Sequence, residues 1–140
     1  MPQIISLEGD LRSGKSTTLD LLYDLMKAKG YTAVLDRRKS QSRDLTVILQ
    51  KEGINIGLSS YGNNAALIGR HVDSFIEKGC SIIICACRTY GLTKNILENY
   101  SDCTKTFIAK TTATFKSNRQ KVNLLDAKKI LKEIEEKLEH

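Results

Sequence analysis

The sequence predicts an α/β fold in which a mainly parallel, doubly wound sheet of five or six strands carries helices on both faces. Three observations at the start of the chain support this fold class. Residues 3–8 form a short apolar run that ends at Gly9, a pattern typical of a buried strand. Apolar residues then recur at helical spacing over 15–29, and a second apolar run follows over 31–36. A strand, a helix and a second strand in this order form a βαβ unit, whose strands run parallel.

The rest of the chain continues the alternation of strands and helices. Two apolar runs flank the turn at 51–53, which predicts a hairpin that gives the sheet an antiparallel edge. The almost wholly apolar run at 81–86 predicts a central strand. In order, the expected elements after residue 36 are strands at 45–49 and 54–59, a helix at 64–78, a strand at 81–86, a short helix at 93–100, a strand at 106–109 and a closing amphipathic helix marked by Leu125, Ile130, Leu131 and Ile134.

Composition and length predict a single cytoplasmic domain. The chain has 140 residues, of which 41% are hydrophobic and 27% charged, and these are ordinary globular values. No apolar run approaches the roughly 20 residues of a membrane span, and the N-terminus has no pattern of an export signal. Residues 138–140 resemble the start of a histidine tag, so the domain is expected over 1–137. The net charge of +6 allows acidic partners such as nucleotides, nucleic acid or anionic surfaces, of which nucleic acid is not favoured. The lack of an apolar run of membrane-spanning length predicts no membrane partner.

Residues 9–16 match the phosphate-binding pattern G-x-x-x-x-G-K-[ST] in full. Glycines let successive backbone N–H groups turn toward phosphate oxygens, and the N-terminus of the following helix adds its positive dipole end. Lys15 would reach the β- and γ-phosphates, and the Ser16 hydroxyl would ligate Mg²⁺. The alternative is a Gly-Lys-Ser turn that only caps a helix. The predicted nucleotide-binding residues are Gly9, Asp10, Leu11, Arg12, Ser13, Gly14, Lys15, Ser16 and Thr17.

The first quarter of the chain resembles the opening of P-loop nucleotide kinases, thymidylate kinase most of all. The resemblance covers residues 3–36: Ile4-Ile5-Ser6-Leu7-Glu8-Gly9, the loop, Thr17-Thr18-Leu19 and the helix that closes in Gly30-Tyr31. It implies a fold of the P-loop NTPase type, with ATP and Mg²⁺ as cofactors. It also implies a catalytic role for Lys15, and it places Arg12 near the transferred phosphate. The chain departs from these kinases in its shorter length and in Cys87-Arg88-Thr89, where they carry Asp-Arg-Tyr.

A carboxylate that orients the metal is harder to place, because the strand at 81–87 offers none. Asp36 closes the second strand, and ligands gather at the carboxyl ends of strands in open α/β sheets. In related deoxynucleoside kinases an acid at that position acts as the base, so Asp36 is the first candidate for a catalytic and metal-binding acid. The alternative is a solvated carboxylate beside Arg37 and Arg38. A further hypothesis is that Ser59, Ser60 and Asn63 hold water on Mg²⁺ or sense the γ-phosphate.

Cysteines and basic stretches add weaker signals. Cys85 and Cys87 share one face of a strand and are expected to be buried thiols rather than a zinc site, although Cys87 at the strand end could be exposed and reactive. His71 is expected on the surface. The basic stretch at 37–43 would overhang the nucleotide, and residues 116–121 could contact the base or form a lid. The tyrosines at plausible positions for stacking nucleic-acid bases are Tyr31, Tyr61 and Tyr90.

These observations predict Mg²⁺-dependent binding of a nucleoside triphosphate, ATP, with transfer of its γ-phosphoryl group to an unidentified acceptor. The enzyme would be an ATPase if the acceptor is water and a kinase if it is a small molecule. One alternative is a nucleotide-dependent switch or adaptor with little turnover, favoured by the missing strand-end acid. A second alternative is a nucleic-acid-associated ATP-binding protein that uses the basic loops.

Overall fold

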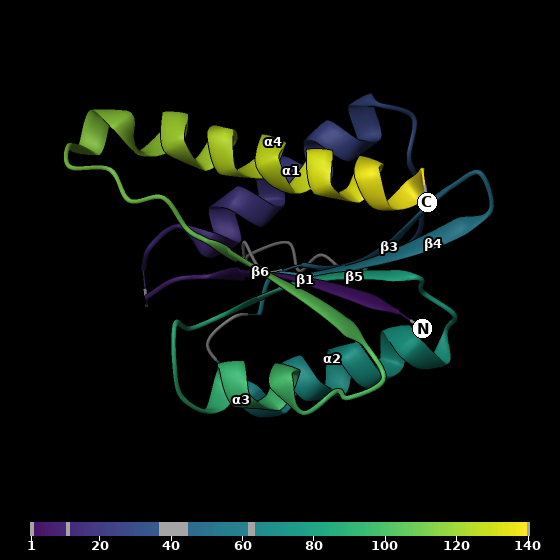
Figure 1. The fold of residues 1–140 in the computed structure, drawn as a ribbon. Helices are drawn as coiled ribbons and strands as arrows, with labels where there is room; N and C mark the ends of the chain where they lie inside the picture. The colour runs from purple at the N-terminus through teal and green to yellow at the C-terminus, as the bar shows by residue number, and fades with distance from the viewer. Residues whose placement is uncertain (1, 11, 37–44, 62–63, 140) are drawn as a thin grey trace.

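The computed structural model describes residues 2–10, 12–36, 45–61 and 64–139. Figure 1 shows a sheet between two layers of helices, with α1 and α4 on one face and α2 and α3 on the other. The prediction of an α/β fold with five or six strands and helices on both faces is therefore confirmed, and the sheet has six strands. The elements are β1 (Gln3–Glu8), α1 (Lys15–Ala28), β2 (Thr32–Asp36), β3 (Thr46–Lys51), β4 (Ile54–Ser59), α2 (Ala65–Glu77), β5 (Ile82–Cys87), α3 (Leu92–Glu98), β6 (Thr104–Ala109), a 3₁₀ turn (Lys116–Asn118) and α4 (Arg119–Leu138).

The sheet is mixed, with the strand order β2-β3-β4-β5-β1-β6. β1 pairs in parallel with β5 and β6, and β4 pairs in parallel with β5. β3 runs antiparallel to both of its neighbours, β2 and β4. β5 lies in the interior of the sheet, as the apolar run at 81–86 predicts. The antiparallel pair of β3 and β4 follows from the predicted hairpin. The antiparallel pairing of β2 with β3 is the departure from the mainly parallel, doubly wound sheet that the sequence predicts.

The β3–β4 hairpin forms as expected, but it does not lie at the edge of the sheet. β2 pairs outside it and occupies the edge instead. The physical reason lies in the burial of the strands. Val47, Ile48 and Leu49 are consecutive and all buried, so both faces of β3 are covered, as for an interior strand. In β2 exposed and half-buried residues alternate and Val34 is 53% exposed, a pattern that an edge strand tolerates.

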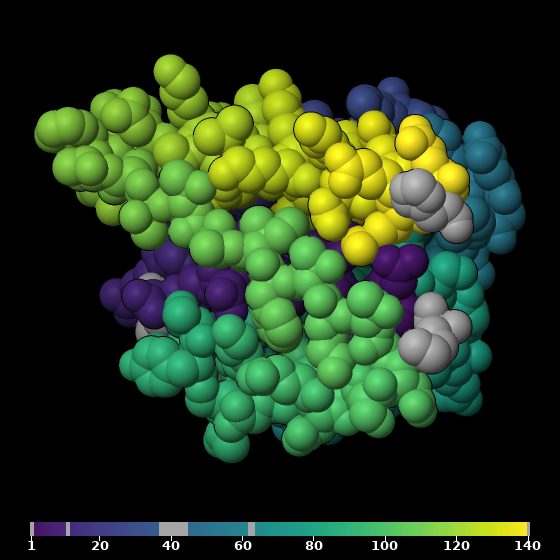
Figure 2. Space-filling model, in the orientation of Figure 1, coloured from purple at the N-terminus to yellow at the C-terminus, as the bar shows by residue number. Residues whose placement is uncertain are grey.

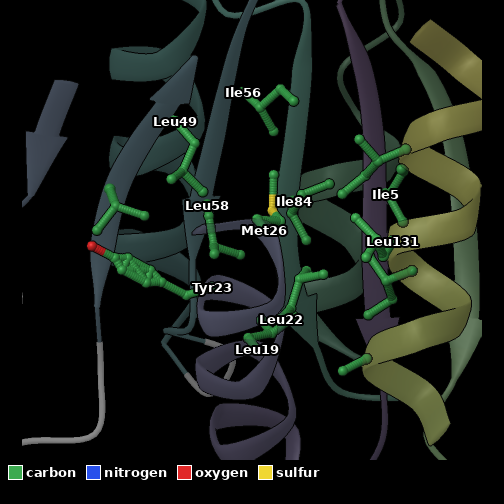
Figure 3. Close-up of a cluster of buried hydrophobic side chains, with 14 of the residues drawn as sticks. Ile5, Leu19, Leu22, Tyr23, Met26, Leu49, Ile56, Leu58, Ile84 and Leu131 are labelled. Atoms are coloured by element: carbon green, nitrogen blue, oxygen red, sulfur yellow. The ribbon is translucent and has the colours of Figure 1, made fainter. Parts of the chain in front are cut away.

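The two faces of the sheet carry separate hydrophobic clusters. On β1, Ile5 and Leu7 pack against α1 and α4, whereas Ile4 packs against α2 and α3. This alternation follows from the two-residue period of a strand. In Figure 3, Leu22 and Met26 of α1 lie against the sheet. Each fully buried side chain of this size contributes about 1.5–3 kcal/mol, so the packing fixes α1, and with it the loop that precedes α1.

Two features of α4 differ from the sequence-based expectation. The helix begins at Arg119, so part of the basic stretch at 116–121 forms its first turn. Its buried face consists of Asn123, Asp126, Ala127, Ile130, Leu131 and Ile134. Leu125, which the spacing assigned to that face, is 50% exposed. At the other end of α4, Leu138 packs against the core. Within the described residues, no helix combines the length and apolar character that a membrane crossing requires.

Candidate functional site

The candidate site lies where β1, β5 and β6 end. These three parallel strands are in register, so Glu8 is level with Cys87 on one side and with Ala109 on the other. The chain leaves β1 at Gly9, whose N–H donates to the Cys87 carbonyl at 3.1 Å. On the other side, the N–H of Lys110 donates to the Glu8 carbonyl at 2.7 Å. The loop at 9–16 therefore starts from a rigid part of the sheet, the edge at which α/β proteins place their ligands.

Gly9 is required by the space around it, and Gly14 by its backbone conformation. A Cβ atom on Gly9 would lie 2.6 Å from Ser13 Oγ and 2.9 Å from Lys110 Cβ. Gly14 has a φ of +95°, and a Cβ on it would lie 2.8 Å from Asn123 Oδ1 on α4. Arg12 also adopts a positive φ, of 64°, which is uncommon outside glycine and marks a tightly turned backbone. Leu11, a predicted binding residue, lies outside the described residues.

Lys15 folds back over this loop. Its Nζ donates hydrogen bonds to the carbonyl oxygens of Gly9, at 2.7 Å, and of Asp10, at 2.9 Å. The side chain is buried. Burial lowers the pKa of Lys15, and Arg88 lowers it further, while Cys87 and Asp10 have the opposite effect. The ammonium group is thus held inside the loop by carbonyl oxygens, which an anion with stronger acceptor oxygens could replace.

Helix α1 begins at the end of the same loop, with Gly14 as its N-cap residue. The first N–H groups of a helix have no partner within the helix, and the N-cap residue Gly14 has no side chain to supply one. The first turn contains no acidic residue, so nothing in that turn offsets the positive end of the helix dipole. The Ser16 hydroxyl lies in this turn and donates to the Ser60 carbonyl at 3.4 Å. Ser60 is fixed in turn, because its Oγ accepts the N–H of Leu45 at 2.8 Å.

A cleft of about 740 Å³ separates this loop from the start of α4. In Figure 2 the start of α4, at the upper left, projects past the purple N-terminal segment. Arg12, Lys15 and Arg119 contribute positive charge, and among the described residues that line the cleft there is no carboxylate. Such a lining suits an anionic ligand that also has a polar, non-ionic part. On one side the cleft is lined by residues 12–17, and on the other by Thr111, Thr112, Ala113, Arg119, Gln120, Val122 and Asn123.

The wall opposite the loop was largely missed by sequence reasoning. Arg119 and Gln120 belong to the basic stretch at 116–121, but Asn123 was not singled out. A signal for it was present. Asn123 and Asp126 occupy the same helical face as Ala127 and Ile130, and polar residues on an apolar face need partners or a function.

The structure does not bring Asp36 to the loop. In the register of the sheet, Asp36 pairs with Val47, and Val47 pairs with Leu58 of β4. Two strand spacings, about 10 Å, therefore separate Asp36 from β4. Ser60, which contacts Ser16 of the loop, directly follows β4. By contrast, Ser60, which was expected to hold water on Mg²⁺ or sense the γ-phosphate, contacts Ser16 of the loop through its carbonyl oxygen.

Ser59, beside Ser60, faces α2 instead of the loop. Ser59 is buried and shares a 2.8 Å hydrogen bond with His71 Nδ1. His71 is half-buried rather than fully on the surface, and its ring packs edge-on against Tyr61. Burial lowers the pKa of His71, and Arg70 lowers it further. Asn63, the third residue of this hypothesis, lies outside the described residues, as does the basic stretch at 37–43.

Cys85 and Cys87 are buried thiols, as expected, whereas the alternative for Cys87 and the expectation for Tyr31 are wrong. Cys87 is completely buried and accepts a hydrogen bond from Ser6 Oγ at 3.1 Å, so it is not exposed and reactive. Burial raises the pKa of its thiol. Of the tyrosines proposed for base stacking, Tyr31 is buried, and Tyr90 is 76% exposed. The described residues contain no group of three or more His, Cys, Asp and Glu side chains that could hold a metal ion.

Comparison with known proteins gives one partial match. The chain is 36% identical over 55 residues to a protein from Sulfurisphaera tokodaii named "Probable thymidylate kinase". The match covers 39% of this chain and 28% of that protein. No protein-family model matches the chain, and no solved structure matches it. The similarity is thus to a segment of a nucleotide kinase, which points to a relationship with such proteins at most.

Proposed function

We propose that this chain binds ATP with Mg²⁺ in the cleft between the loop at 9–16 and α4, and transfers the γ-phosphoryl group to an acceptor. The observation that carries the proposal is the loop itself. It combines a glycine required by close contacts, a glycine at a positive φ, an inward-folded Lys15 and a helix N-terminus with no side-chain cap, all at the carboxyl end of a buried parallel strand. These are the parts of a P-loop NTPase, the fold type that the resemblance implies.

The phosphates would lie on the loop side of the cleft. Lys15 Nζ would exchange the carbonyl oxygens of Gly9 and Asp10 for the β- and γ-phosphate oxygens. The N–H groups at the start of α1 would donate to the same phosphates. Gly9, Asp10, Leu11, Ser13, Gly14 and Thr17 complete the proposed phosphate-binding residues, and Arg12 would stabilise the charge that develops on the transferred group.

Magnesium would be held by the Ser16 hydroxyl and the phosphate oxygens. A bound Mg²⁺ ion would neutralise part of the phosphate charge and fix its geometry. Oxygen is the ligand type that Mg²⁺ requires, and the contact between Ser16 and the Ser60 carbonyl brings two protein oxygens together there. Asp36 is the sequence-based candidate for a second protein ligand or a base. Its hydrogen bond from Tyr23 and its position two strands from β4 argue against that role, so its substitution is a separate test.

The nucleoside part of ATP would extend along the other wall of the cleft, over residues 111–113 and toward Asn123. A volume of about 740 Å³ lies within the range of small-molecule sites. The partial match to a nucleotide kinase favours a nucleotide as acceptor. A second candidate function is a nucleotide-dependent switch or adaptor, because the described residues lining the cleft include no acid to assist turnover.

The proposal is tested by calorimetric titration of Mg²⁺-ATP into the wild type and into Lys15→Met, which keeps the buried aliphatic stem. Charge-assisted hydrogen bonds are worth about 1.5–3 kcal/mol each, so the affinity should fall on the order of tenfold to a hundredfold. Lys29→Met is the matched control, because it removes an equal charge just beyond the other end of α1. Its affinity should match the wild type.

Product analysis then identifies the acceptor. Wild-type protein is incubated with γ-labelled ATP and a panel of nucleoside monophosphates. Labelled diphosphate would identify a nucleotide kinase, labelled inorganic phosphate an ATPase, and binding without either product a switch. If the wild type binds no nucleoside triphosphate, or if Lys15→Met binds as tightly as the wild type, the proposed function is wrong.

A further inference from the structure

A buried ion pair lies directly behind the wall of the cleft that faces the loop. Lys110 Nζ lies 3.1 Å from Asp126 Oδ2, and both side chains are fully shielded from solvent. Lys110 is the first residue after β6, and Asp126 lies on the buried face of α4. The pair therefore joins the end of the sheet to the helix, at the point where the chain turns from β6 into the cleft wall.

Thr111 is bound to this ion pair through all of its polar atoms. Its N–H and its hydroxyl both donate to the Asp126 carboxylate, each at 2.7 Å. Its carbonyl oxygen accepts a hydrogen bond from Lys110 Nζ at 2.6 Å. Burial raises the pKa of Asp126, but these hydrogen bonds and the Lys110 charge outweigh it, so the pKa lies below its usual value. Thr111 is also the first residue of the wall that lines the cleft.

A buried ion pair is a poor way to stabilise a fold, because desolvation of the two charges offsets much of their attraction. Apolar residues of similar size would fill the same space at least as well. What apolar residues could not do is hold the backbone and the hydroxyl of Thr111 in one orientation. The free-energy cost of desolvating the two charges is therefore accompanied by a fixed orientation of Thr111 at the cleft.

The geometry points to Asp126, together with Lys110, as a positioning device that preorganises residues 111–113 for the nucleoside part of the bound nucleotide. This inference rests on the proposed nucleotide site. A preorganised wall does not have to be ordered on binding, so its effect appears as ligand affinity. The effect should be confined to ligands that reach the wall. The phosphate groups contact the loop, and a ligand made of phosphates alone should not sense the ion pair.

Two double variants separate the hydrogen bonds from the charges. Lys110→Met/Asp126→Ala removes both charges and the acceptor for Thr111. Lys110→Met/Asp126→Asn removes both charges but keeps an oxygen that Thr111 can reach. Methionine retains the stem of Lys110 beside Gly9. Each protein is titrated with Mg²⁺-ATP and, separately, with Mg²⁺-tripolyphosphate, after thermal unfolding has shown that it folds.

The expected result is a change in the affinity for ATP and no change in the affinity for tripolyphosphate. In Lys110→Met/Asp126→Ala the Kd for ATP should rise about tenfold, because the wall must now be ordered on binding, while the Kd for tripolyphosphate stays within twofold of the wild type. The Asn variant should bind ATP nearly as well as the wild type. Thr111→Val leaves the ion pair intact and serves if the Ala variant does not fold. It removes one of the two hydrogen bonds from Thr111 to Asp126, and it should weaken the binding of ATP but not of tripolyphosphate.

The matched control is Lys29→Met/Glu135→Ala, which removes an exposed ion pair between α1 and α4. Its ratio of ATP to tripolyphosphate affinity should equal that of the wild type. An unchanged ATP affinity in the folded Ala variant and in Thr111→Val overturns the inference. Equal losses for both ligands also overturn it, because the pair would then support the loop. A wild type that binds neither ligand contradicts the proposed function itself.

Discussion

The Tyr23 hydroxyl donates a 2.7 Å hydrogen bond to Asp36 Oδ2 and thereby joins the middle of α1 to the end of the edge strand β2. Tyr23 is buried against the sheet, and it lies seven residues after Ser16 on α1. At a rise of 1.5 Å per residue, the two positions are about 10 Å apart along the helix. The carboxylate is thus engaged well away from the start of α1, where the phosphates are proposed to bind.

Asp36→Asn should change Mg²⁺-dependent turnover by less than about threefold. The reason is distance, because a protein oxygen must approach Mg²⁺ to about 2.1 Å to ligate it. The substitution should lower the free energy of unfolding by about 1 kcal/mol through the weaker hydrogen bond from Tyr23. Steady-state phosphate release and urea unfolding measure the two effects. A general acid or base contributes about 10²–10⁴ in rate, so a loss of that size would restore Asp36 as a catalytic residue.

Gly14→Ala should weaken the binding of both ATP and tripolyphosphate by about tenfold or more. Alanine at a φ of +95° is strained, and its Cβ would lie 2.8 Å from Asn123 Oδ1 and displace that side chain, so both the loop backbone and the cleft wall would be disturbed. The control is Gly30→Ala, at the other end of α1. Gly30 has a φ of +92° but open space around it. That variant should lose about 1 kcal/mol of stability, the cost of a left-handed backbone for a residue with a Cβ, and bind both ligands as the wild type does. Calorimetry and thermal unfolding measure these effects, and equal binding by the two variants would contradict the role given to Gly14.

Acid should remove a part of the stability that depends on Asp126. The folded protein holds the pKa of this carboxyl below its usual value of 3.8, whereas the unfolded chain has the usual value. Above 3.8 the stabilisation is fully present, and it is lost as the pH falls through the lower folded pKa. The free energy of unfolding of the wild type should therefore fall more steeply below pH 4 than that of Lys110→Met/Asp126→Ala. Urea unfolding at several pH values tests this, and parallel pH curves would contradict it.

The local structure of the site could be predicted from the sequence because its determinants are local. The run at 3–8 and the pattern at 9–16 define a strand, a loop and a helix start through residues that are neighbours in the chain. The bounds of β4 agree fully with the apolar run at 54–59. Strand order could not be predicted in the same way. It depends on which strands pair across the sheet, and the hairpin could have been added at the edge as easily as inside β2.

The cleft wall escaped prediction for a different physical reason. Leu125 was assigned to the buried face of α4 because it is apolar, but the face is rotated by one residue and includes Asp126 instead. A buried carboxylate contradicts simple apolar patterning, and only its partners explain it. Lys110 and Thr111 are about fifteen residues away in sequence, with Thr111 at a separation of 15. Contacts of this kind become visible only when the fold brings β6 and α4 together.

Arg12→Ala should reduce the turnover of ATP about tenfold and leave ATP affinity within about twofold. Arg12 lines the cleft on an exposed, tightly turned backbone, and its φ of 64° is no more favourable for alanine than for arginine. The comparison therefore reports the side chain rather than the backbone. A charge that acts mainly on the transition state lowers the barrier without tightening ground-state binding. Tenfold in rate corresponds to about 1.4 kcal/mol.

The wild type itself should hydrolyse ATP slowly, below about 0.01 per second, the slow end of intrinsic turnover in P-loop proteins. The cleft is open, and its described lining contains no carboxylate to orient an attacking water. Steady-state phosphate release at saturating ATP measures the hydrolysis rates of the wild type and of Arg12→Ala. Arg12→Lys keeps the charge, and its rate should lie between the two. Fast hydrolysis by the wild type would mean that an acid outside the described lining takes part. Equal rates for wild type and Arg12→Ala would make Arg12 a surface charge with no part in phosphoryl transfer.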